Sequence, residues 1–247
     1  MNLDFVEALH LTQQLGVLLR HRPLEHVDVV VAPPFVDLRT VSSVIESERL
    51  PIALAAQHVS EHRAGPFTGE VSVAMLQRLT VAAVIVGHSE RRAHYAMDDD
   101  VVARTVRAVT ASGLDAIVCV GEDGDVRDEG HHVTFVAEQL RRALGAGTES
   151  QRGRVCVAYE PVWAIGRGTS ATAEQVREMS RAIREVLVSL NLGDARVLYG
   201  GSVNGENAST LLRDGEVQGF LVGGASLRAE SFVAILRASD DCYARKR

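Results

Sequence analysis

Residues 155–199 read VCVAYEPVWAIGRGTSATAEQVREMSRAIREVLVSLNLGDARVLY, and this stretch decides the fold. An apolar run, Val155–Tyr159, precedes an amphipathic segment, Thr172–Leu190, and a second apolar run, Arg196–Tyr199, follows it. Apolar residues recur at helical spacing in the middle segment, which opens with the capping box of Thr172 and Gln175. Two short apolar runs joined by a helix predict parallel strands with the helix outside the sheet.

The same alternation continues in both directions along the chain. Most of the short runs are almost continuously apolar, as expected of strands buried on both faces. The seven predicted strands are Val27–Ala32, Ile52–Gln57, Ala82–Gly87, Asp115–Gly121, Val155–Tyr159, Arg196–Tyr199 and Gly219–Gly223. A helix from Leu3 to about Arg20 opens the chain with no strand before it. We therefore expect the apolar face of this helix to be poorly covered at Phe5, Val6, Leu9 and Leu15. Because a closed barrel needs eight strands, the pattern predicts either an open doubly wound sheet or a barrel without its first strand.

Composition narrows the class of protein. The chain has 247 residues, 46% of them apolar and 23% charged, with a net charge of -6. No linker or low-complexity tract divides it, so residues 1–247 are predicted to form a single domain. The net charge is negative and the basic residues form no stripe, which argues against nucleic acid as a partner. No apolar run approaches the roughly 20 residues that span a membrane, and the N-terminus lacks the cationic region of a signal peptide.

The three cysteines show neither a metal-ligand spacing nor an even number for disulfides. Cys119 and Cys156 lie inside apolar runs, and we expect them to be reduced core residues of a cytoplasmic protein. Neither a metal nor an organic cofactor is predicted.

Glu160 directly follows the run Val155–Tyr159 and precedes Pro161. Working groups of parallel barrels collect at the C-terminal ends of the strands, where a partly desolvated carboxylate can act as a general base. A carboxylate that only caps the following turn would occupy the same place, and position alone favours neither interpretation.

His88 is the histidine, among nine, that stands at a strand end between Gly87 and Ser89. If a short helix starts there, its N-terminal dipole favours the neutral imidazole. A neutral ring can donate a hydrogen bond to a carbonyl and to the enediolate formed from it. The alternative is a packing histidine, which is the commoner role for a lone histidine.

Glycines follow the last two predicted strands, as Gly200-Gly201-Ser202 and as Gly223-Gly224. Backbone N–H groups of glycine can approach an anion closely, and barrel phosphate sites often lie after strands seven and eight. Plain turns are the alternative. The small-residue segment Ala164–Ala171 suits a lid that closes as one piece, or an ordinary loop.

Several motifs together resemble the triosephosphate isomerase family. They occur in the family's order across nearly the whole chain: Ala32-Pro33-Pro34-Phe35, Gly65-Pro66-Phe67-Thr68-Gly69-Glu70, His88-Ser89-Glu90-Arg91-Arg92, residues 158–166 (AYEPVWAIG), residues 199–203 (YGGSV) and residues 219–227 (GFLVGGASL). The resemblance implies a (β/α)8 TIM barrel, here with the first strand missing from this chain.

The resemblance also implies roles for residues. Glu160 matches the family's catalytic base and His88 its neutral electrophile, roles that come from the family and not from the spacing. Ser89 and Glu90 match supporting residues beside the histidine. Four residues match the backbone phosphate binders: Gly166, Ser202, Gly223 and Gly224. Thr68 matches the tip of a loop that inserts into a neighbouring subunit, which implies a homodimer.

The chain departs from the family at its start. The family's first strand ends in Asn-x-Lys-Met-Asn, and Met1-Asn2 stands where the last two residues of that motif would lie. The strand and the substrate lysine are therefore absent from this sequence. A gene start placed at an internal methionine accounts for this, and a degenerate paralogue is the alternative. Met97 replaces a usual glutamate near the dimer interface, and His58 a usual asparagine.

The implied reaction interconverts dihydroxyacetone phosphate and D-glyceraldehyde 3-phosphate through an enediolate, without a metal or cofactor. Two other functions fit the same motifs. One is isomerisation of a four-carbon ketose phosphate such as erythrulose phosphate. The other is binding of a sugar phosphate or a protein by a barrel that has lost catalysis, which the absent strand favours and the presence of Glu160 and His88 opposes.

Overall fold

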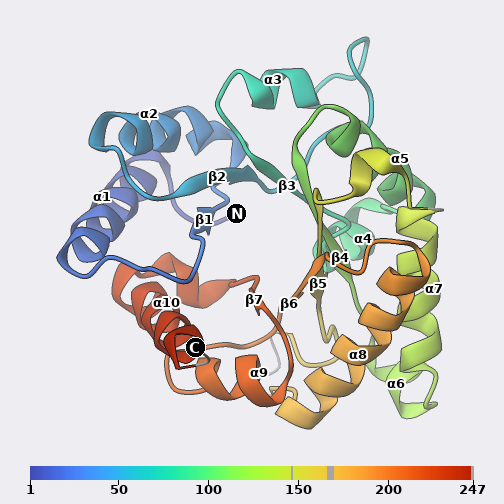
Figure 1. Ribbon diagram of the computed structural model, residues 1–247. Helices are drawn as coiled ribbons and strands as arrows, with labels where there is room; N and C mark the ends of the chain where they lie inside the picture. The colour runs from blue at the N-terminus through green and yellow to red at the C-terminus, as the bar shows by residue number, and fades with distance from the viewer. Residues whose placement is uncertain (146, 166–169, 246–247) are drawn as a thin grey trace.

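The computed structural model describes residues 1–145, 147–165 and 170–245, and its strands form one parallel sheet in sequence order (Figure 1). Every strand lies inside the run that the sequence predicted, and most are shorter, which confirms the predicted parallel order. The strands are β1 (Val30–Val31), β2 (Ala53–Ala56), β3 (Ala83–Val86), β4 (Asp115–Val120), β5 (Val155–Tyr159), β6 (Arg196–Tyr199) and β7 (Gly219–Phe220).

Helices follow the strands and lie outside the curved sheet (Figure 1). The predicted capping box is present at the start of α8, where Thr172 Oγ1 accepts from Gln175 N and Gln175 Oε1 accepts from Thr172 N. The α-helices are α1 (Phe5–His21), α2 (Leu38–Glu48), α3 (Val73–Gln77), α4 (Ser89–Tyr95), α5 (Asp99–Ala111), α6 (Gly124–Asp128), α7 (His132–Leu144), α8 (Ala173–Ser189), α9 (Ala208–Asp214) and α10 (Ala229–Ala244). Short 3-10 turns are η1 (Phe35–Asp37), η2 (Glu149–Gln151) and η3 (Gly224–Leu227).

The sheet is that of a TIM-type α/β barrel with seven strands present. Its two ends are β1 and β7, and no ladder joins them within the described residues. This confirms the predicted gap between the last strand and the first. On β1 the Val30 side chain is 38% exposed, whereas strand residues in the middle of the sheet, such as Val84 and Val157, are fully buried.

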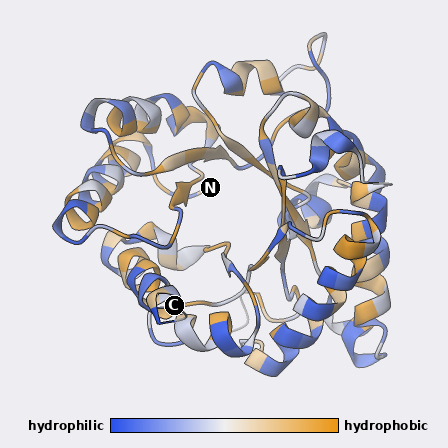
Figure 2. Ribbon diagram, viewed as in Figure 1, coloured by the Kyte–Doolittle hydropathy of each residue, from blue (hydrophilic) through white to orange (hydrophobic). Residues whose placement is uncertain are grey.

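The main core lies between the outer face of the sheet and the helices (Figure 2). Met179 and Ile183 of α8, for example, are buried there together with Val157 of β5. A small second cluster joins Ile85, Cys119 and Ala158 from three neighbouring strands. The three cysteines are free thiols, Cys119 buried and Cys156 half-buried.

Helix α1 is better covered than its sequence suggested. We expected its apolar face to be poorly covered where the preceding strand is absent. Leu15 is instead only 2% exposed, because it packs in a cluster with Phe232 and Val233 of α10. The expectation was wrong for Leu15 and holds at the start of the helix, where Phe5 is 61% and Val6 40% exposed.

None of the helices in the described residues combines the length and the apolar character that crossing a bilayer requires.

Candidate active site

Glu160 lies at the C-terminal end of β5, in the middle of the sheet. Its backbone N–H donates to Val120 O at 2.8 Å, so the chain is still paired with β4 at this residue. A Cβ on Gly121 would lie 1.8 Å from Glu160 O, which explains why the end of β4 carries glycine here. The Glu160 side chain is only 2% exposed. A carboxylate in such a place needs hydrogen-bond partners.

Both carboxylate oxygens of Glu160 find partners at the start of α4. Oε1 lies 2.8 Å from His88 Nε2, and Oε2 accepts from the backbone N–H of Ser89 at 2.9 Å. The structure thus joins the two residues that the sequence singled out at separate strand ends. Glu160 does not merely cap the turn that follows it.

His88 is the N-cap of α4 and its ring is held by the helix that begins there. Its Nδ1 accepts from the backbone N–H of Glu90 at 3.3 Å, so the ring proton resides on Nε2 and faces Glu160. A ring that carries its proton on Nε2 alone is neutral. Burial lowers the pKa of His88, but the hydrogen bond and charge of Glu160, together with the charge of Glu90, outweigh burial and raise it above the ordinary value.

The backbone N–H that donates to Nδ1 favours a neutral ring, whereas the raised pKa favours a charged one, and the geometry explains both. The helix N-terminus keeps Nδ1 unprotonated, whereas the buried Glu160 carboxylate beside Nε2 stabilises the imidazolium. The raised pKa therefore belongs to the arrangement in which Glu160 touches the ring. The Glu90 carboxylate adds a smaller effect, because it is 74% exposed and lies 3.9 Å from Nδ1.

The residues expected to hold phosphate lie further along the same rim. Gly200, at the end of β6, is adjacent to Glu160, since a Cβ on Gly200 would lie 3.0 Å from Glu160 Cγ. Ser202 follows and is exposed, with its carbonyl accepting from Asn207 Nδ2 at 3.3 Å. Gly223 and Gly224 follow β7, the neighbour of β6, and are exposed. Gly166 and part of the expected lid, residues 166–169, lie outside the described residues.

The glycines after β7 are not required by packing. A Cβ built on Gly223 or Gly224 meets no atom within 4 Å. Gly223, at φ -84° and ψ -116°, has a backbone conformation outside the regions allowed to other residues, whereas Gly224 begins the 3-10 turn η3. Both glycines leave open space at this point of the rim.

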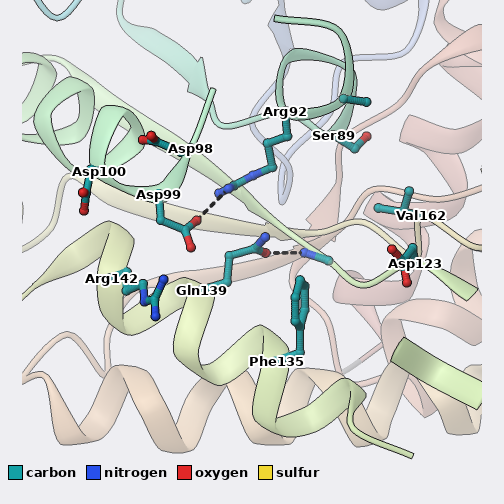
Figure 3. Close-up of a pocket in the computed structure, with 12 residues that line it drawn as sticks. Ser89, Arg92, Asp98, Asp99, Asp100, Asp123, Phe135, Gln139, Arg142 and Val162 are labelled. Carbon is teal, nitrogen blue, oxygen red and sulfur yellow. Dashed lines mark hydrogen bonds and ion pairs between the residues drawn. The ribbon is translucent and has the colours of Figure 1, made fainter. Parts of the chain in front are cut away.

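A pocket of about 560 Å³ lies beside the pair, between α4, α5 and α7 (Figure 3). Ser89 and Val162 line it, but neither Glu160 nor His88 does. Its walls carry four carboxylates, Asp123 and the acidic run Asp98–Asp100, and two guanidinium groups, of Arg92 and Arg142. The two bonds drawn in Figure 3, Arg92 to Asp99 and Gln139 to Gly121, brace its walls.

Sequence reasoning missed Glu122, a fully buried carboxylate at the end of β4. Its Oε1 accepts from Tyr159 Oη at 2.9 Å, from Trp163 Nε1 at 2.9 Å and from Arg127 Nη1 at 2.8 Å. Burial and the nearby Glu122 charge raise the pKa of Tyr159, which therefore acts as a donor. The available signal was its place at a strand end, where Glu160 also lies. Two of its three partners, Tyr159 and Trp163, come from a distant segment of the chain.

Thr68 lies on an exposed loop between β2 and α3. Within this loop Phe67 stacks on His62 with ring centroids 3.8 Å apart. The two residues that depart from the family both turn inward: Met97 is 5% exposed and the His58 side chain 13%. Burial and the charge of Arg91 lower the pKa of His58 to about 4.

Fold and site together define a class of protein. A buried carboxylate and an imidazole, in contact at the C-terminal ends of barrel strands, can move a proton to and from carbon while stabilising the developing oxyanion. This is the arrangement of a barrel enzyme that works by general acid–base catalysis.

Comparison with known proteins identifies the family. The family model described as "Triosephosphate isomerase" matches residues 1–239. Proteins of that name are similar to the chain in Rhodococcus jostii (strain RHA1), 43% identical over 95% of this chain and 92% of the relative, and in Corynebacterium glutamicum (strain ATCC 13032), 42% identical with the same coverage. The relative from Mycobacterium tuberculosis (strain CDC 1551 / Oshkosh) is 44% identical, again over 95% and 92%. The chain belongs to the triosephosphate isomerase family.

Proposed function

We propose that this chain interconverts dihydroxyacetone phosphate and D-glyceraldehyde 3-phosphate in the cytoplasm, with Glu160 as the base and His88 as the electrophile. The observation that carries the proposal is the 2.8 Å contact between Glu160 Oε1 and His88 Nε2. It brings an acceptor and a donor of protons to one point on the rim of the barrel.

The mechanism uses proton transfers alone. Glu160 removes a proton from the carbon beside the carbonyl, and the electron pair moves onto the carbonyl oxygen as the enediolate forms. His88 Nε2–H donates to that oxygen and moves protons between the two enediolate oxygens. Glu160 then returns its proton to the neighbouring carbon. These steps balance without a metal or cofactor.

The substrate must displace existing hydrogen bonds of the base. Glu160 Oε1 faces His88 and Oε2 accepts from Ser89 N. A substrate placed between Glu160 and His88 separates them, which removes the main influence that raises the pKa of His88. We therefore propose that binding restores a neutral ring able to donate to the carbonyl.

For the phosphate, we propose the backbone N–H groups of Ser202, Gly223 and Gly224, joined by Gly166. The support is their exposure on the rim next to Gly200, together with the open space around Gly223 and Gly224. Short loops at the ends of the strands bind anions through backbone dipoles.

We also propose a homodimer in which the Thr68 loop enters the partner subunit. Large apolar side chains are exposed on this loop, at Phe67 (39%), and elsewhere on the chain, at Phe35 (36%), Met75 (58%) and Tyr95 (65%). A Thr68→Arg substitution should shift the mass in multi-angle light scattering from dimer to monomer, with Arg63→Lys as a control on the same loop. A wild-type chain that stays monomeric at every concentration contradicts the dimer.

Substrate and base are tested together by side-by-side assays of triose and four-carbon ketose phosphates. For Glu160→Asp we expect turnover of the triose to fall by about 10²–10⁴-fold, because the shortened base no longer reaches the carbon. Affinity for inorganic phosphate should remain. The matched control is Glu174→Asp on the exposed start of α8. Equal turnover by Glu160→Asp rejects the base, faster turnover of the four-carbon substrate revises the specificity, and phosphate binding without any turnover indicates a binding protein.

A further inference from the structure

The buried carboxylate of Glu122 joins the two residues that flank the catalytic base. Tyr159 immediately precedes Glu160, and Trp163 follows it by three residues. Both side chains donate to the same oxygen, Glu122 Oε1, at 2.9 Å. The backbone that carries Glu160 is therefore held from both sides by one acceptor.

Arg127 of α6 completes this arrangement. Its Nη1 donates to Glu122 Oε1 at 2.8 Å, and its guanidinium lies 4.8 Å from the centroid of the Trp163 ring. The side chain is 14% exposed and Glu122 is fully buried, so the pair is largely removed from water. A buried carboxylate without its counter-charge is strongly destabilised. Arginine can bond and stack at once because its fork is planar, which lysine cannot do.

A second carboxylate lies on the outer side of Arg127. Glu178 Oε2 of α8 is 3.8 Å from Arg127 Nη2 and 3.3 Å from His132 Nε2 of α7. Glu178 is about half exposed, so its attraction is partly screened. The contacts run from α8 through Arg127 and Glu122 to Trp163, and they give Arg127 an ionic partner on each side.

We propose that Arg127 is a positioning residue for the catalytic base, and that Glu178 keeps Arg127 in place. The inference rests on the proposed function in that it takes Glu160 as the base. Arg127 touches neither Glu160 nor His88 in this arrangement and acts through Glu122 and Trp163. A base that is misplaced by about 1 Å can cost about 10²-fold in rate.

The first test is Arg127→Lys, which keeps the charge and loses the fork and the stacking. We expect kcat to fall about 10-fold while KM changes less than about 2-fold, because the base is displaced and the phosphate site is not. Trp163 is the only tryptophan of the chain. Its fluorescence emission and its quenching by acrylamide therefore report directly on its contacts with Glu122 and Arg127. Both should change. The control is Arg177→Lys on α8, whose partner Glu174 lies 3.9 Å away at the surface.

The second test removes the outer charge with Glu178→Gln. We expect about a 2–3-fold fall in kcat and a smaller change of Trp163 quenching in the same direction, since the interaction is half exposed. Glu174→Gln, on the same helix and 85% exposed, is the matched control. Equal effects of the two substitutions overturn the role of Glu178.

A third measurement separates positioning from loss of stability and from failure of the proposed function. The imidazole signals of His88, assigned by their absence from His88→Gln, are titrated by NMR in wild type and Arg127→Lys. Displacing Glu160 weakens its contact with Nε2, so the titration midpoint of His88 should move down. An inactive wild-type chain rejects the proposed isomerase activity. The NMR titration and the Trp163 quenching still show whether Arg127 positions Glu160. Unchanged midpoint and quenching overturn the proposal, whatever happens to the melting temperature.

Discussion

The middle of the sheet and its two ends differ in how firmly they are built. Residues 116–120 of β4 pair in register with residues 155–159 of β5, and these strands are almost entirely buried. At the ends of the sheet, β1 and β7 are two-residue strands, and Val30 of β1 is 38% exposed. The proposed catalytic pair, Glu160 and His88, belongs to the first region, and two of the proposed phosphate binders, Gly223 and Gly224, follow β7.

Because of this difference, the middle of the sheet suits the exact placement of side chains, and its ends suit access to the backbone. Long paired strands have high local stability and hold side chains in one place, which a proton transfer needs. Short strands with open edges leave backbone groups free for other partners. We expect substitutions in the middle to change the chemistry, and changes at the ends to alter stability or anion binding.

The largest expected effect comes from His88→Gln in the well-paired region. The substitution removes the ring that faces Glu160, and kcat should fall by about 10²–10⁴-fold. The melting temperature should change little, because the ring is partly exposed and the neighbouring strands remain paired. His94→Gln, an exposed position on the same helix, is the control. If kcat and stability fell together, the two regions would not differ in the way that we describe.

Closing the open edges should have the next largest effect. A family-like strand ending in Asn-x-Lys, fused ahead of Met1, can pair with β1 and β7 and cover Phe5, Val6 and Val30. Several added backbone hydrogen bonds of about 1 kcal/mol each predict a rise in melting temperature of roughly 10 °C in calorimetry.

The matched control for the added strand ends in Ala-x-Ala. It should raise the melting temperature equally and leave turnover lower, since the lysine supplies the charge for the substrate. Equal stability with and without the strand would show that these edges are already satisfied in solution.

An intermediate effect is expected at His58, which is buried beside Arg91. Its pKa of about 4 in the folded state lies below the ordinary 6.5, so the unfolded chain takes up a proton first as the pH falls. Stability should decrease between about pH 6.5 and pH 4, by about 3 kcal/mol at most, at about 1.36 kcal/mol per pH unit. In urea titrations His58→Asn should lose this acid-side decrease, and His62→Asn, an exposed neighbour, should keep it. An unchanged decrease in His58→Asn contradicts the assignment.

The smallest effect on stability is expected for Gly224→Ala, at the loosely paired end, because Gly224 lies in the 3-10 turn η3. The new Cβ meets no atom within 4 Å, so stability should change by less than about 0.5 kcal/mol. Calorimetric binding of inorganic phosphate should weaken, because the methyl group occupies the approach to the backbone. Gly201→Ala is the contrast, since its Cβ would lie 2.2 Å from Tyr199 Oη and should destabilise the fold. Unchanged phosphate affinity in Gly224→Ala rejects this anion site.

The sequence by itself determined the order of the strands, the α8 helix and the rim on which Glu160 and His88 stand. These features depend on residues a few positions apart. Apolar runs produce buried strands, and a threonine and a glutamine three residues apart cap a helix. For the same reason the gap between β7 and β1 could be predicted by counting strands.

Only the tertiary structure decided how these parts meet. The sequence showed neither the hydrogen bond from Ser89 N to Glu160, nor the convergence of Tyr159, Trp163 and Arg127 on Glu122, nor the cover that α10 gives to Leu15. Each of these contacts joins segments that lie far apart in the chain or on different elements. Their partners are selected by packing and by the need to satisfy buried polar groups, which no local pattern of residues encodes.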